Sequence, residues 1–123
     1  MYNYFMLIGY VSTDVELKEV GNPLKKVVKL NLAVQRDFKN PDGQYDTDFF
    51  RITLWDFMAQ VCVDNLTKGS KIGIKGRMVP VTEESVNGYK VHFTDLIGER
   101  VIFFDSKKPM EISIEDEEKE SDN

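Results

Sequence analysis

The sequence has too few thiol and imidazole groups for several kinds of site. It holds one cysteine and one histidine, so it can form neither an internal disulfide nor a closed zinc site. No apolar run approaches the roughly 20 residues that span a bilayer. The first eleven residues lack the basic stretch and the small-residue cleavage site of a secretory signal. We therefore expect a cytoplasmic protein without a metal ion or a cofactor.

The sequence also offers little for catalysis. His92 lies in an alternating strand pattern and Cys62 lies on the apolar side of a predicted helix, so structural roles are favoured for both. Residues 73–77 (GIKGR) have neither the spacing nor the context of a phosphate-binding or dinucleotide-binding motif. Asp46 and Asp48 share a strand face, but two acids near a turn are usually solvated. We predict that the protein is not an enzyme.

The acidic charge is concentrated at the C-terminal end. The chain has 123 residues, enough for one domain, and a formal net charge of −5. Residues 111–123 hold seven acids and one lysine, a net −6, which leaves 14 acids and 15 bases, a net +1, in the rest. A near-neutral body can still present a basic face to nucleic acid, whereas a like-charged terminal run is usually disordered. We therefore predict a domain of residues 1–109 and an acidic tail of residues 110–123.

The body alternates between apolar and polar residues, which indicates β-strands. Glycine, proline and asparagine mark turns that separate five such segments, over residues 4–11, 28–35, 48–55, 72–78 and 89–104. We expect a two-residue hairpin turn at Asn87-Gly88 and a bulge at Gly98.

One segment has helical spacing instead. Ala59, Cys62, Val63 and Leu66 recur at the spacing of one helix face, which predicts a helix over residues 57–67 with Asp56 as its N-terminal cap. The order is then three strands, a helix and two strands. It favours an all-β protein, a five-stranded OB-fold barrel with one helix between strands 3 and 4, although other β-barrels fit the same periodicity.

The third predicted strand has an unusual outer face. One set of alternating residues is an ordinary core row: Phe50, Ile52 and Leu54. The residues on the opposite face combine aromatic rings with a guanidinium: Phe49, Arg51, Thr53 and Trp55. Such a face suits single-stranded nucleic acid, because the rings can stack on bases while arginine contacts phosphate. The alternative is a second packed face against a subunit or a loop.

In order and spacing, several segments together resemble the bacterial single-stranded DNA-binding proteins over about residues 3–104. They are residues 3–11 (NYFMLIGYV), 14–18 (DVELK), 30–33 (LNLA), 47–55 (TDFFRITLW), 68–70 (KGS), 74–77 (IKGR) and 94–95 (TD). The resemblance implies an OB-fold protein that binds single-stranded DNA without sequence preference during replication, recombination and repair. It also implies that Phe38, Phe49 and Trp55 stack on bases and that Arg51 contacts the DNA, with RNA binding left open.

Basic residues extend this predicted site. Lys75 and Arg77 share one face of the fourth strand, Lys29 lies in the second, and Arg36 precedes Phe38 near a hairpin. The complete predicted DNA site is Phe38, Phe49, Arg51, Trp55, Lys29, Arg36, Lys75 and Arg77. The resemblance further implies a homotetramer, with a dimer as the second choice, and replication or recombination proteins as partners. A protein-interaction module such as a primosomal accessory protein is the alternative function.

The sequence departs from the family in several places, including one hairpin and the C-terminal end. The hairpin between the fourth and fifth strands looks short and carries Glu83 and Glu84, which would repel phosphate. The acidic end also lacks the Pro-Phe tip and the long linker of cellular members, which suggests a phage or mobile-element member.

Overall fold

The computed structural model describes residues 1–105 and 110–117, most of them in strands. The elements are β1 (Phe5–Val11), β2 (Lys18–Val20), β3 (Lys25–Lys39), β4 (Tyr45–Trp55), α1 (Asp56–Asn65), β5 (Lys71–Glu84), β6 (Lys90–Phe103) and β7 (Met110–Ser113). In this described part of the chain, no helix has the length and apolar character that a membrane crossing requires.

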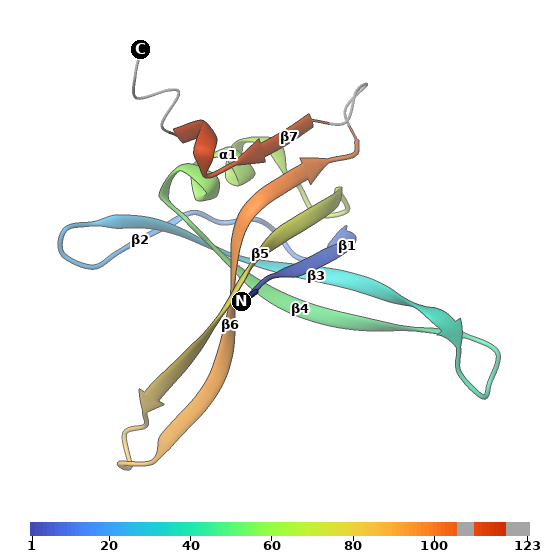
Figure 1. The fold of residues 1–123 in the computed structure, drawn as a ribbon, viewed down its shortest axis with the longest axis horizontal. Helices are drawn as coiled ribbons and strands as arrows, with labels where there is room; N and C mark the ends of the chain where they lie inside the picture. The colour runs from blue at the N-terminus through green and yellow to red at the C-terminus, as the bar shows by residue number, and fades with distance from the viewer. Residues whose placement is uncertain (106–109, 118–123) are drawn as a thin grey trace.

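The strands form one sheet that closes on itself. Its hydrogen-bonded order is β1-β5-β6-β4-β3-β2, and a further pairing of β1 with β3 completes the ring. All pairs are antiparallel except the short contact of β4 with β6. The barrel strands are thus β1, β3, β4, β5 and β6, and α1 lies between the third and fourth of them (Figure 1). The predicted OB-fold barrel is confirmed.

The core follows the predicted alternation of the strands, except at Phe50, which is half-buried and lies outside the core cluster. The fully buried aliphatic residues on their inner faces include Val28, Leu30, Leu32, Ile52, Leu54, Ile72, Ile74 and Val101. The helix α1 adds Met58, Ala59 and Cys62 to the same cluster. Burial raises the pKa of the Cys62 thiol to about 12, so the thiol stays neutral and serves as a small core residue, as predicted.

The helix begins differently from the prediction. Asp56 is its first residue and not its cap, and no side chain caps the helix N-terminus. The backbone of Asp56 has a φ of +47°, which turns the chain directly from β4 into α1. Its carboxylate instead accepts a hydrogen bond from the backbone N–H of Lys26 (3.1 Å). The capping prediction is therefore wrong, because a partner distant in sequence holds this side chain.

Two long hairpins extend away from the barrel. The β3–β4 and β5–β6 hairpins point in different directions, the first to the right and the second downward in Figure 1. The β5–β6 ladder continues to the pair Glu84 and Lys90, so the expected short hairpin is wrong. Its loop spans residues 85–89 and is closed by the Ser85 N–H, which donates to the Tyr89 carbonyl (2.7 Å), and not by a two-residue turn.

The C-terminal segment also differs from the prediction. Residues 110–113 form β7, which pairs with the end of β6, so the division at Pro109 does not mark the end of the sheet. Ile112 lies opposite Val101 and packs against the core, while Glu111 accepts a hydrogen bond from Arg100 (3.0 Å). A strand of four residues is too short for alternation alone to reveal it. The end of the predicted tail, residues 118–123, lies outside the described residues.

Candidate nucleic-acid interface

The outer face of β4 carries the predicted aromatic row. Phe49 is 69% exposed and Trp55 is 37% exposed, with the exposed Arg51 between them. The residue opposite Phe49 on β3 is Ala33, whose small side chain leaves the ring uncovered. Trp55 is the last residue of β4, fixed by the turn into α1. The predicted face of these three residues is confirmed, and their row is called the β4 row below.

Thr53 lies in this row but is fully buried. The Lys29 ammonium donates to the Thr53 hydroxyl oxygen (2.8 Å), and that hydroxyl donates to Asp95 Oδ1 (2.8 Å). The three side chains therefore form a hydrogen-bonded bridge across β3, β4 and β6. The bridge fills the space between Arg51 and Trp55 and holds the Lys29 charge next to the row.

Arg51 differs from the other arginines of the described residues. Arg36, Arg77 and Arg100 each lie within 4.0 Å of a carboxylate oxygen, whereas Arg51 forms no ion pair and no side-chain hydrogen bond within residues 1–105 and 110–117. Its guanidinium keeps all of its donors, which match phosphate geometry. Arg51 is thus the arginine best prepared to bind an anion.

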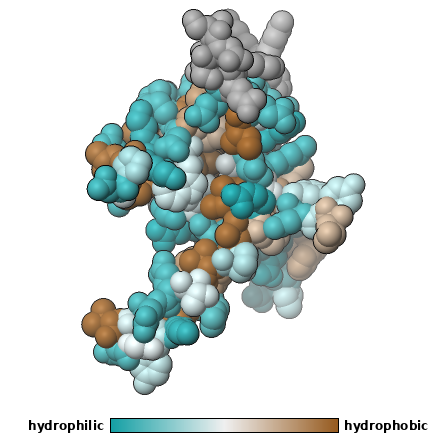
Figure 2. Space-filling view, turned by 60° about the vertical axis from the view of Figure 1, so that its left-hand side comes forward, coloured by the Kyte–Doolittle hydropathy of each residue, from teal (hydrophilic) through white to brown (hydrophobic). Residues whose placement is uncertain are grey.

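The β5–β6 hairpin forms a second wall beside the β4 row. A hollow of about 550 Å³ is lined by Lys29, Arg51, Glu83, Val91, Phe93, Thr94 and Asp95. Figure 2 shows hydrophobic residues interspersed with hydrophilic ones from the body down along this hairpin, the lower projection. Phe93 was not predicted as a site residue. The alternation of Val91, Phe93 and Asp95 could have revealed it once the hairpin was known to face the β4 row.

Arg36 and Phe38 lie farther along the β3–β4 hairpin. Arg36 makes two hydrogen bonds of 3.0 Å to Asp48 and lies 3.7 Å from Asp46. The hydrogen bond and the charge of Asp48 raise the pKa of Arg36, and the same pairing lowers the pKa of Asp48. Arg36 lies two residues beyond Val34, which is opposite Asp48, and so alternates onto the face away from Phe49. Its charge is already partnered there.

Phe38 is 65% exposed and lies in the part of β3 where the pairing with β4 is irregular. The register is irregular between Gln35 and Lys39, and Lys39 lies opposite Tyr45, with its ammonium 5.9 Å from the Tyr45 ring centre. Side chains do not alternate regularly through such a bulge, so the strand register does not assign Phe38 to a face of the hairpin. Its stacking role stays a prediction.

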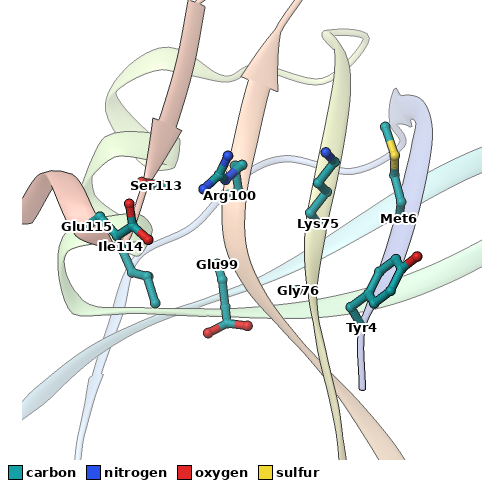
Figure 3. Close-up of a pocket in the computed structure, with 9 residues that line it drawn as sticks. All are labelled: Tyr4, Met6, Lys75, Gly76, Glu99, Arg100, Ser113, Ile114 and Glu115. Atoms are coloured by element: carbon teal, nitrogen blue, oxygen red, sulfur yellow. The ribbon is translucent and has the colours of Figure 1, made fainter. Parts of the chain in front are cut away.

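Lys75 and Arg77 have different surroundings, although they share a strand face. Lys75 lies opposite Met6, in a hollow of about 540 Å³ that β1, β5, β6 and residues 113–115 line together (Figure 3). Arg77 on β5 lies opposite Ile97 on β6, and Ile97 in turn lies beside Thr53 of β4. The Nε atom of Arg77 is 3.9 Å from a carboxylate oxygen of Glu99. Arg77 is therefore adjacent to the β4 row, whereas Lys75 is not.

Comparison with known proteins agrees with this arrangement. The model of the single-strand binding protein family matches residues 2–104. Single-stranded DNA-binding protein B of Bacillus subtilis is 33% identical over 107 residues, 87% of this chain and 94% of the relative. Single-stranded DNA-binding protein 1 of Clostridium acetobutylicum is 28% identical over 106 residues, 86% and 96% of the two chains. This chain therefore belongs to the single-strand binding protein family.

Proposed function

We propose that this protein binds single-stranded DNA without sequence preference and without catalysis, during replication, recombination and repair in the cytoplasm. The observation that carries the proposal is the β4 row. Two exposed aromatic rings flank Arg51, which has no carboxylate partner among the described residues. Each ring offers a base a stacking surface while the guanidinium pairs with the phosphate between bases.

The geometry favours a single strand over a duplex. In a duplex, both faces of each base are covered by its neighbours, so a protein ring cannot stack on them without opening the helix. The rings of Phe49 and Trp55 stand on an open strand surface, where unstacked bases can reach them. The bases then bind by stacking and the phosphates bind by charge, and neither interaction depends strongly on the base sequence.

Trp55 provides the test, because it is the only tryptophan of the chain. Adding oligo-dT at low salt should quench its fluorescence as bases stack on the ring, and an equal mass of duplex should quench it much less. If the fluorescence stays constant and no oligonucleotide is retained, the proposal is wrong. That result would favour the alternative, a protein-interaction module such as a primosomal accessory protein.

We further propose that the protein is a homo-oligomer, a tetramer in preference to a dimer, and that β1 supplies a contact. The outer face of β1 and the residue before it expose four large residues in one row, to between 44% and 66% of their surface: Tyr4, Met6, Ile8 and Tyr10. Figure 3 shows the first two of them beside the hollow that contains Lys75. A contiguous apolar row on a strand is a common mark of a protein–protein contact.

The substitution Ile8→Glu should lower the mass of the particle, because it places a charge in the middle of this row, where a subunit contact would leave it buried and unpaired. The mass would be measured by analytical ultracentrifugation at micromolar protein. Val20→Glu is the matched control, since Val20 is similarly exposed (41%) but lies on β2. If Ile8→Glu and the unmodified protein sediment alike, β1 is not the contact.

A further inference from the structure

The β5–β6 hairpin, which forms one wall of the hollow of about 550 Å³, presents one row of side chains toward the β4 row. In the β5–β6 ladder, Glu83 lies opposite Val91, Phe93 opposite Val81, and Asp95 opposite Val79. Alternation places all six on one face of the hairpin. Of these, Glu83, Val91, Phe93 and Asp95 line the hollow of about 550 Å³ together with Lys29 and Arg51. The hollow has the volume of pockets that hold drug-sized ligands.

Phe93 has the position and the exposure of a stacking platform. Its ring is 42% exposed, and its cross-strand neighbour Val81 supports it from the hairpin side. Phe93 faces the hollow that Arg51 also lines. A base held in the hollow can therefore stack on Phe93 while the adjoining phosphate pairs with Arg51.

The charges of the hollow are divided between its two walls. The cations Lys29 and Arg51 come from β3 and β4, and the carboxylates Glu83 and Asp95 come from β5 and β6. Carboxylates repel phosphate, so this division directs the DNA backbone toward β3 and β4 and the base edges toward the hairpin. A strand bound in the hollow is therefore oriented with its backbone toward β3 and β4 and its bases toward the hairpin.

The two carboxylates have acceptor capacity to spare. Glu83 makes no side-chain hydrogen bond or ion pair within the described residues. Asp95 accepts from Thr53 at Oδ1, and its Oδ2 accepts no hydrogen bond from the described part of the chain. Asp95 lies two residues from Phe93 along β6, and Glu83 lies opposite Val91, two residues from Phe93 in the other direction. The two carboxylates are thus each about 7 Å along the strand from the ring, on opposite sides of it. A base stacked on Phe93 thus has a carboxylate within reach of its edge.

We infer that this hollow holds nucleobases stacked on Phe93, with their edges toward Glu83 and Asp95, and that the two carboxylates add a modest preference for cytosine over thymine to binding that otherwise does not depend on sequence. The inference rests on the proposed function. Cytosine presents its N4 amino group as a donor, which a carboxylate accepts, whereas thymine presents the O4 carbonyl at the same position. Stacking binds either pyrimidine, and the carboxylates discriminate between them.

The test compares oligo-dC with oligo-dT of equal length, at one salt concentration, for the unmodified protein and for Glu83→Gln. The dC-over-dT affinity ratio should fall about fivefold in Glu83→Gln, because the amide both donates to thymine O4 and accepts from cytosine N4. Glu84→Gln is the matched control. It makes the same charge change one residue farther along β5, on the opposite face of the hairpin, and should leave the ratio unchanged.

A second pair of variants tests the stacking. Phe93→Ala should weaken the binding of both oligonucleotides about tenfold. His92→Ala should leave both affinities unchanged, since His92 lies on the other hairpin face, 3.0 Å from the Thr82 hydroxyl. The inference is overturned if Glu83→Gln keeps the unmodified ratio, or if Phe93→Ala binds both oligonucleotides normally. If the unmodified protein retains neither oligonucleotide, the proposed function itself is wrong.

Discussion

Replacing Trp55 by alanine is expected to weaken the binding of single-stranded DNA by about 1–3 kcal/mol while the protein stays folded. The ring is 37% exposed and ends the β4 row, so it can stack on a base without leaving its place. Its loss removes a stacking surface and leaves the core cluster intact, because Trp55 is not part of that cluster. Affinity would be measured by fluorescence anisotropy of a labelled oligo-dT, and folding by far-UV circular dichroism.

The control removes an exposed ring that lies outside the β4 row. Tyr2 is 93% exposed and precedes β1, with its ring 6.3 Å from that of Tyr4. Tyr2→Ala should bind oligo-dT as the unmodified protein does. Equal affinities for Trp55→Ala and Tyr2→Ala would show that the β4 row is not the binding surface, and unfolding of Trp55→Ala would show that its ring supports the fold.

The face of the β4 row could be predicted from the sequence because it depends on strand geometry alone. Side chains alternate along any strand, and the apolar set Phe50, Ile52 and Leu54 identifies the core side. The opposite set, including Phe49 and Arg51, must then point outward. Neither step requires knowledge of which strands pair.

The elements that were missed depend on partners distant in sequence. The outer end of β5, residues 79–84, was not predicted, although the facing strand over residues 89–104 was. Its strand character comes from the ladder with β6 that reaches Glu84 and Lys90. The strand β7 exists because the end of β6 has a free edge for Ile112 to join. The carboxylate of Asp56 is held by the backbone of Lys26, 30 residues away. Local periodicity contains none of this information.

Which of the basic residues face the β4 row could not be predicted from the sequence either, because this too depends on how the strands pair. Alternation places Lys75 and Arg77 on one face of β5, but the β5–β6 register shifts between Lys75 and Gly76. Such irregularities increase the local twist of a strand pair, so neighbouring positions on one face come to point toward different surroundings. Arg36 was assigned by its charge, which Asp48 already partners.

This same register shift makes Gly76 the glycine at which we expect the largest loss of stability. Gly76 pairs with Gly98 beside the irregularity. A Cβ added at Gly76 would overlap the backbone carbonyl of Ile97 on β6 and would lie 2.9 Å from the Phe5 ring. A backbone group in a paired strand cannot move aside without separating β5 from β6, so the overlap costs more than the displacement of a flexible side chain.

Gly76→Ala is therefore expected to destabilise the protein by about 3 kcal/mol or more, at the upper end of the effects of overpacking. This corresponds to a fall of about 10 °C or more in Tm for a chain of this size. Gly73→Ala is the matched control on the same strand, because a Cβ there would meet its nearest neighbours, Phe104 and Ile8, at 3.4 and 3.5 Å, ordinary contact distances. Thermal unfolding followed by circular dichroism at one protein concentration compares the two. Equal melting temperatures would mean that β5 and β6 can part at the register shift without loss, and that the groove wall bearing Phe93 is not held in place there.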